Sequence, residues 1–139
     1  MSALFPAFFF TVALLVTTAY FLMGGLPLLV LQHDTPVDAR FIRGFFNLYY
    51  RAVLVTAVGA AASYARLGWL AFAAGKAAVA LAAVLLRSRL IPAMEQLGTQ
   101  IQTGDEAARV RFRRIHSAAL MVNLVQLVAL VWGLTRIRL

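Results

Sequence analysis

The stretch WLAFAAGKAAVALAAVLLRSRL, residues Trp69–Leu90, decides the fold. It is long and apolar enough to cross a bilayer as one helix, which takes about 20 predominantly apolar residues. Lys76 is its only ionisable side chain before Arg87. Alanine is its commonest residue, and small residues let helix backbones approach closely in lipid. We therefore expect this helix to be the most enclosed part of a transmembrane bundle.

Three further apolar stretches extend the pattern, and the chain as a whole is 63% hydrophobic and only 13% charged. So few charges can hardly supply the polar surface of a soluble domain of 139 residues. The predicted spans are about 4–31, 41–64, 69–90 and 112–134. The sequence predicts an all-α integral membrane four-helix bundle with antiparallel up-down topology, formed by a single domain over residues 1–139.

Proline, glycine and polar residues set the expected ends of these helices. Pro27 predicts a kink or an end of the first helix, because proline removes an amide donor. The second helix is predicted to run continuously from Phe41, and the alternative is a flat interfacial segment over residues 41–50. Ile91–Gln102 is expected to be an interfacial, partly helical extension with Pro92 in a first turn.

The connections between the spans are short. Ala65–Trp69 is predicted to form a tight turn, and Thr103-Gly104 is predicted to end the extension after the third span. Asp105 and Glu106 indicate the start of the last helix, since acidic residues are favoured at the positive end of the helix dipole. Met1–Gln32 carries no ionisable side chain, so we interpret it as a retained first helix rather than a signal peptide.

Arginine is distributed unequally between the two ends of the predicted bundle. The end formed by the first and third connections carries Arg40, Arg43, Arg51, Arg87, Arg89, Arg109, Arg111, Arg113 and Arg114, and the opposite end carries Arg66, Arg136 and Arg138. The positive-inside rule predicts a cytoplasmic basic end and non-cytoplasmic termini in a bacterial inner membrane. The net charge of +8 is then explained by the arginines that set the membrane topology. We expect the basic face to meet anionic lipid or an acidic partner, and we do not expect nucleic-acid binding.

Lys76 is the first candidate for a binding residue, because ionisable side chains within a span are costly and often functional. Antiparallel helices place Lys76 and Gln126 at similar depth, with Asn123 about one turn deeper and Thr11 and Thr56 at similar levels. No aspartate or glutamate occurs within any predicted span. Two interpretations stay open: the lysine snorkels or bonds locally, or it meets an anion from a ligand or partner.

The last helix carries a polar stripe. His116, Ala119, Asn123 and Gln126 share one face by helical periodicity, and Phe112 extends that face beyond the bilayer together with Arg109. The simpler interpretation is hydrogen bonding between helices. The alternative is a small polar pocket for a lipid headgroup or a quinone, to which Arg51 could also contribute.

Few residues suggest catalysis or metal binding. His33 and His116 are predicted on the same side of the membrane, where two histidines could hold a haem, but no further ligand pattern supports a metal site. The chain has no cysteine, which excludes thiolate chemistry and cysteine-ligated metals. No catalytic residues are predicted, because the sequence has no nucleophile–histidine–acid spacing and no phosphate-binding glycine loop.

The segment RFRRIHSAALMVNLVQLV, residues Arg111–Val128, resembles the final helix of a family of small four-helix membrane proteins. These are the bacterial relatives of transmembrane protein 205, which are mostly domains of unknown function. Phe112, His116, Ser117 and Asn123-Leu124 match in order. The stretches GGLPLLVLQ, RGFFNLYYR and IPAMEQL match more loosely. A second family, related to anthrone oxygenases, has the same layout, and that resemblance would imply oxygenase chemistry.

The leading functional expectation is an accessory or structural subunit that packs against a larger membrane complex or self-assembles. It rests on the alanine-rich surface, the unpartnered Lys76 and the basic face. One alternative is a module that binds a quinone, haem or lipid near His116 and Gln126. Another is a small oligomeric transporter, although no acid lies within a span to couple protons.

Overall fold

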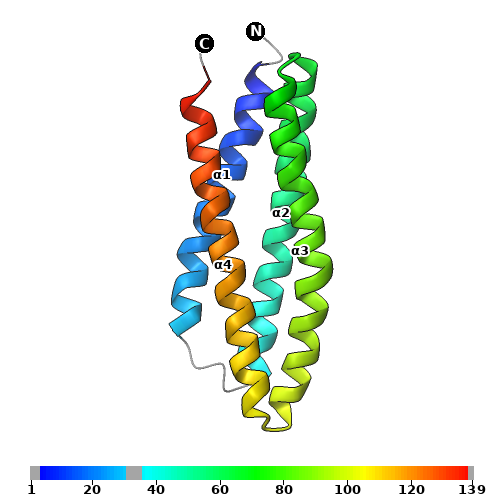
Figure 1. The fold of residues 1–139 in the computed structure, drawn as a ribbon, viewed down its shortest axis with the longest axis vertical. Coiled ribbons are helices and arrows are strands. Elements are labelled where there is room, and N and C mark those ends of the chain that lie inside the picture. The colour runs from blue at the N-terminus through cyan, green and yellow to red at the C-terminus, as the bar shows by residue number, and fades with distance from the viewer. Residues whose placement is uncertain (1–3, 31–35, 138–139) are drawn as a thin grey trace.

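The computed structural model describes residues 4–30 and 36–137. Within them lie four helices: α1 (Leu4–Val30), α2 (Pro36–Arg66), α3 (Leu70–Gln102) and α4 (Glu106–Thr135). The helices alternate in direction, so α1 begins and α4 ends at the same end of the bundle (Figure 1). All four are long and apolar enough to cross a membrane. The predicted all-α membrane bundle with up-down topology is therefore confirmed.

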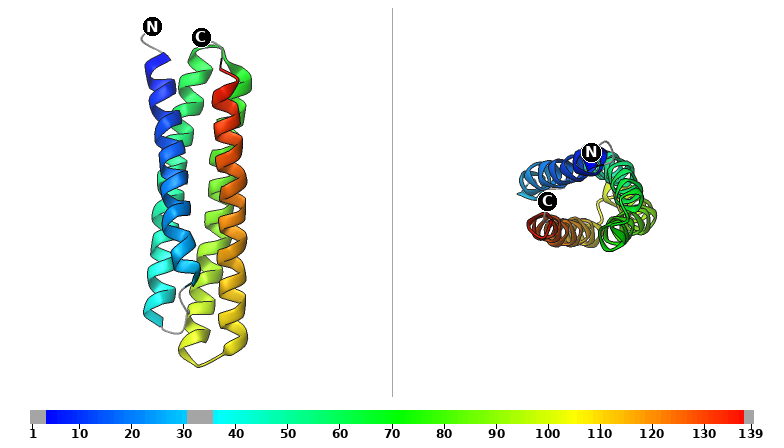
Figure 2. Two further views of the ribbon diagram at one scale, coloured as in Figure 1. Left: turned by 90° about the vertical axis from the view of Figure 1, so that its left-hand side faces the viewer. Right: turned by 90° about the horizontal axis from the view of Figure 1, so that it is seen from above.

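The helices lie in chain order around the bundle (Figure 2). We call the end with Leu4, Arg66, Leu70 and Thr135 the termini end, and the other the basic end. α2 and α3 form the most extensive contact, α1 packs on α2 and α4, and α4 packs on α1 and α3. The α3–α4 contact is much smaller than the α2–α3 contact, although a short turn joins each pair. α3 and α4 are therefore loosely associated neighbours.

Both tight turns use a glycine in the left-handed region. Gly68 has φ 75° and Gly104 has φ 81°, where a side chain would be strained. In each turn the amide after the glycine bonds a carbonyl five residues back: Trp69 N to Tyr64 O at 3.0 Å, and Asp105 N to Gln100 O at 3.3 Å. This pattern closes the C-terminus of a helix and satisfies its last carbonyls. The two predicted breaks are confirmed.

Asp105 starts α4, as predicted. Its side chain accepts hydrogen bonds from Ala107 N at 2.9 Å and Ala108 N at 3.2 Å, which satisfies two of the amides left free at the helix start. Glu106 lies in the first turn, where its charge complements the helix dipole.

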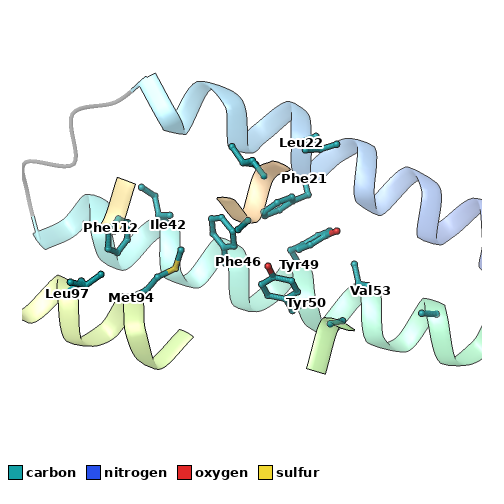
Figure 3. Packing of buried hydrophobic residues seen from close by; sticks show 14 of the residues in the cluster. Phe21, Leu22, Ile42, Phe46, Tyr49, Tyr50, Val53, Met94, Leu97 and Phe112 are labelled. Atoms are coloured by element: carbon teal, nitrogen blue, oxygen red, sulfur yellow. The ribbon is translucent and has the colours of Figure 1, made fainter. Parts of the chain in front are cut away.

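The core is rich in aromatic side chains contributed by α1 and α2 (Figure 3). The Phe21 ring stacks on Tyr49 with centroids 3.8 Å apart and meets the edge of Phe46 at 4.9 Å. Phe46 and Tyr50 are also fully buried. Helical periodicity turns Tyr49 and Tyr50 inward, while Arg51 is exposed.

Two helix bounds differ from the expectations, the start of α2 and the end of α3. α2 begins at Pro36, whose fixed φ suits a first helical position, rather than at Phe41. α1 passes Pro27 and ends at Val30, close to the predicted end near residue 31. α3 continues through Pro92 to Gln102, so Ile91–Gln102 is not a separate, partly helical segment and Pro92 is not in a first turn.

Burial explains why α3 is not broken. Met94, Leu97 and Ile101 recur at helical spacing beyond the proline and join the hydrophobic core. Their packing offsets the one backbone hydrogen bond that proline removes.

The expectation that α3 is the most enclosed helix is wrong. In the most apolar window of each helix, 17% of α3 residues are buried, compared with 33% in α1 and in α2 and 22% in α4. Small residues predict close packing without saying whether the neighbour lies in the same chain. Here much of the alanine-rich surface near the termini end faces outward.

Candidate functional site

A hydrogen-bonded network joins three helices inside the bundle. Gln126 Nε2 of α4 donates to Thr18 Oγ1 of α1 at 3.1 Å and to Tyr49 OH of α2 at 3.4 Å. Tyr49 OH donates to Asn123 Oδ1 at 2.6 Å, and Asn123 Nδ2 donates to Ala119 O at 2.7 Å. Thr18 Oγ1 donates to Leu14 O at 2.8 Å. Each polar group thereby avoids being buried without a partner, which is costly in hydrocarbon.

The network agrees with the simpler interpretation of the polar stripe, which is hydrogen bonding between helices. Asn123 and Gln126 form the interhelical hydrogen bonds expected from the simpler one. Their partners Thr18 and Tyr49 were not identified from the sequence. A signal for Thr18 was present, since it follows Thr11 by two helical turns on the same face.

Thr11 and Thr56 were predicted at the same depth as Lys76, but the three side chains do not form one cluster. The Thr11 hydroxyl bonds that of Tyr64 at 3.1 Å, beneath a stack of Tyr64, Trp69 and Phe72. Thr56 Oγ1 donates to carbonyls of its own helix at 2.8 and 3.2 Å. A threonine can satisfy its hydroxyl one turn back along its helix, so equal depth does not imply contact.

His116 is fully buried and meets the ring of Phe46 edge-on, with centroids 5.2 Å apart. Phe112 is buried one turn earlier on the same face, as the stripe predicted. His33 lies outside the described residues, so the predicted proximity of the two histidines is not tested. Across residues 4–30 and 36–137, no group of three metal-ligating side chains gathers.

Arg51 does not join the polar network, because it is exposed on α2. The arginines of the basic end form an outer rim instead. Arg40, Arg89, Arg111, Arg113 and Arg114 are exposed, while Arg43, Arg87 and Arg109 are half-buried.

The half-buried arginines have partners on neighbouring turns or helices. Arg43 pairs with Glu95 at 3.0 Å and joins α2 to α3, and Arg109 pairs with Glu106 at 3.2 Å. Arg87 Nε donates to Asn47 Oδ1 at 2.9 Å. The exposed arginines are therefore the ones that can meet lipid or a partner.

A groove lies between α3 and α4 in the half nearest the termini end. It is bounded by residues 71–82 of α3 and by residues 122–136, which belong to α4 and its C-terminal cap, and its volume is about 620 Å³. Its walls are mostly hydrocarbon, aromatic or glycine, and the exceptions are Lys76, Gln126 and Arg136. Arg136 lies over the Trp132 ring at 4.9 Å, near the end of α4. Lys76 and Gln126, which were predicted at similar depth, both line this groove.

Lys76 is the least satisfied charged residue of the groove. It is 8% exposed, and it forms no hydrogen bond or ion pair within the described part of the chain. Burying an ammonium group without a counter-ion or hydrogen-bond acceptor is unfavourable. The groove therefore holds one cationic group that the bundle itself does not satisfy.

Comparison with protein-family models, curated proteins and solved structures finds no match for this chain. The resemblance to the relatives of transmembrane protein 205 stays a prediction.

Proposed function

We propose that this protein is an accessory subunit that packs laterally, through α3 and α4, against another protein of a membrane complex. One observation carries the proposal: the face formed by α3 and α4 is left open, with a groove of about 620 Å³ that contains the buried Lys76. The alanine-rich side of α3 is suited to close helix contact. Ala71, Ala74, Ala77 and Ala78 are exposed on this helix.

The arrangement of the other polar groups favours this function over an internal ligand site. Asn123, Gln126, Tyr49 and Thr18 bond one another across helices, so these groups already have partners. His116 is enclosed by aromatic packing. The residues of the interior network thus stabilise the bundle by bonding one another. Lys76 has no such partner, and a group from outside the bundle would be needed to satisfy its charge.

The exposed arginines support an orientation with the basic end in the cytoplasm and both termini on the other side of a bacterial inner membrane. Anionic lipid headgroups are then their expected neighbours, each basic residue contributing about 1 kcal/mol of attraction near the surface. In this orientation the groove lies in the outer half of the bilayer.

Gentle extraction of the tagged protein, followed by native mass spectrometry, tests the function. The proposal predicts recovery with at least one other membrane protein at a fixed ratio. Recovery of the chain only as a lone monomer would contradict it.

The volume of the groove favours a second candidate, a binding module for an apolar molecule such as a lipid or quinone. About 620 Å³ falls within the usual range of small-molecule sites, roughly 300–1,000 Å³. This candidate predicts one small mass bound at near-stoichiometric amount in the same spectrum, with no second protein.

A further inference from the structure

Two glycines of the groove have no packing role within the bundle. A methyl group added at Gly75 of α3 or Gly133 of α4 would meet nothing within 4 Å. By contrast, a methyl group added at Gly25 would lie 2.5 Å from the Leu120 side chain, and one added at Gly59 would lie 2.6 Å from the Phe10 ring. Those two glycines permit close approach inside the bundle. Gly75 and Gly133 leave space that no described residue fills.

Such glycines are unfavourable in the interior of a helix, because glycine has more backbone freedom to lose than any other residue. In membrane helices they are common where a second backbone approaches closely. Gly75 lies between Ala71 and Ala78 on one face, and Gly133 follows Ala129 at the same four-residue spacing. Both walls of the groove are thus shaped to receive a helix.

Lys76 supplies an observation independent of the small residues. It is more than nine-tenths buried, lines the groove and is the chain's only lysine. Its nearest acidic residue along α3 is Glu95, at the other end of the helix and about 28 Å away by helical rise. The remaining acids of the chain, Asp34, Asp38, Asp105 and Glu106, belong to the basic end by sequence. Among residues 4–30 and 36–137, no acidic side chain lies within reach of Lys76.

We infer that the occupant of the groove is a transmembrane helix of a different protein, which carries an aspartate or glutamate at the depth of Lys76 and packs against Gly75 and Gly133. This inference rests on the proposed function and names the chemistry of the partner. The carboxylate neutralises Lys76, and the close approach of the backbones shields the pair from lipid. Each partner thereby removes the other's unpaired charge from hydrocarbon.

A second copy of this chain does not fit. Two copies with the same orientation would bring one Lys76 toward another, and both copies have their acids at the opposite end. Like charges in a medium of low polarity repel strongly. A lipid acid would match the charge, but flexible acyl chains do not require glycine on both walls. The paired glycines favour a helix.

The test uses the complex extracted gently from native membranes. A lipid-soluble carbodiimide activates a carboxylate, an amine in direct contact with it then forms an amide, and the reagent leaves as its urea. Because Lys76 is the only lysine, peptide mapping separates its products from those of the N-terminal amine. We expect one Lys76 cross-link, to an aspartate or glutamate within a span of another protein.

Substitutions provide the matched comparison. Gly75→Leu fills the groove, and Gly44→Leu places the same side chain on an exposed glycine of α2 that also has nothing within 4 Å. We expect Gly75→Leu to lower the recovered partner at least about tenfold and Gly44→Leu to leave it unchanged. Lys76→Met is expected to lower recovery of the partner, whereas Lys76→Arg is expected to leave recovery near that of the wild-type chain. Neither variant should form the cross-link at position 76.

Each remaining result overturns the inference. If the partner is recovered equally with Gly75→Leu and Lys76→Met, the accessory function stands and the groove is not its docking site. If Lys76 is joined only to a lipid acid, or the groove is covered by a second copy of the chain, the occupant is wrong. If no protein accompanies the wild-type chain, the proposed function itself fails.

Discussion

The hydrogen bond between Tyr49 of α2 and Asn123 of α4 offers a quantitative test of the bundle, because both side chains are buried and the bond is 2.6 Å long. Tyr49→Phe removes the hydroxyl and keeps the ring that stacks on Phe21. Asn123→Ala removes the acceptor. The helix propensity gained with alanine, about 0.5 kcal/mol, cancels in a double-mutant cycle because it appears in both backgrounds.

The expected coupling energy is about 1 kcal/mol. Cycles of this kind in membrane proteins average about 0.6 kcal/mol and reach about 1.7 kcal/mol. The short Tyr49–Asn123 distance places this bond above the average. Gln126 also contacts Tyr49 OH, at 3.4 Å, so the single change Tyr49→Phe should cost more than the coupling alone.

Reversible unfolding in mixed detergent–lipid micelles, followed by circular dichroism, measures the four free energies of unfolding. A coupling below about 0.3 kcal/mol would be within the usual error of additivity. That result would refute the claim that the two side chains stabilise the bundle through their hydrogen bond.

Three further predictions follow from particular residues. Gly59→Ala should lower the free energy of unfolding by about 1–3 kcal/mol, because the new methyl group would lie 2.6 Å from the Phe10 ring. Gly75→Ala should raise the free energy of unfolding of the purified chain by about 0.5–1 kcal/mol. Equal effects of the two variants in chemical denaturation would contradict the difference in packing between the two glycines. Asp105→Ala should cost about 1 kcal/mol through loss of the α4 cap, measurable in the same assay, and no loss would mean that water replaces the cap. A C-terminal tag on intact spheroplasts should be digested by external protease, and a protected tag would reverse the predicted orientation.

The sequence was sufficient for the number and type of helices, since long apolar segments and glycine-containing turns depend on local chemistry. Gly68 and Gly104 ended helices where expected. The buried stripe of α4, including His116 and Asn123, also followed from periodicity alone.

The sequence could not identify which side chains and helix faces contact one another. Tyr49 and Tyr50 suit an interface as well as a core, and only tertiary packing assigned them to the core. The alanine-rich α3 indicated close contact, but its face near the termini end proved to be open. The partner of Thr18 on α4 could not be predicted, because a threonine can also satisfy its hydroxyl within its own helix.

The central claim is that a partner protein covers the groove between α3 and α4 in the membrane. Two exposed valines of α4 provide a direct test: Val125 lines the groove, whereas Val131 lies about 120° around the helix from Val125 and does not line the groove. A photoreactive amino acid would be placed at each position and irradiated in native membranes. The account predicts one discrete protein adduct from position 125 and only lipid adducts from position 131. Lipid adducts alone from both positions would contradict it.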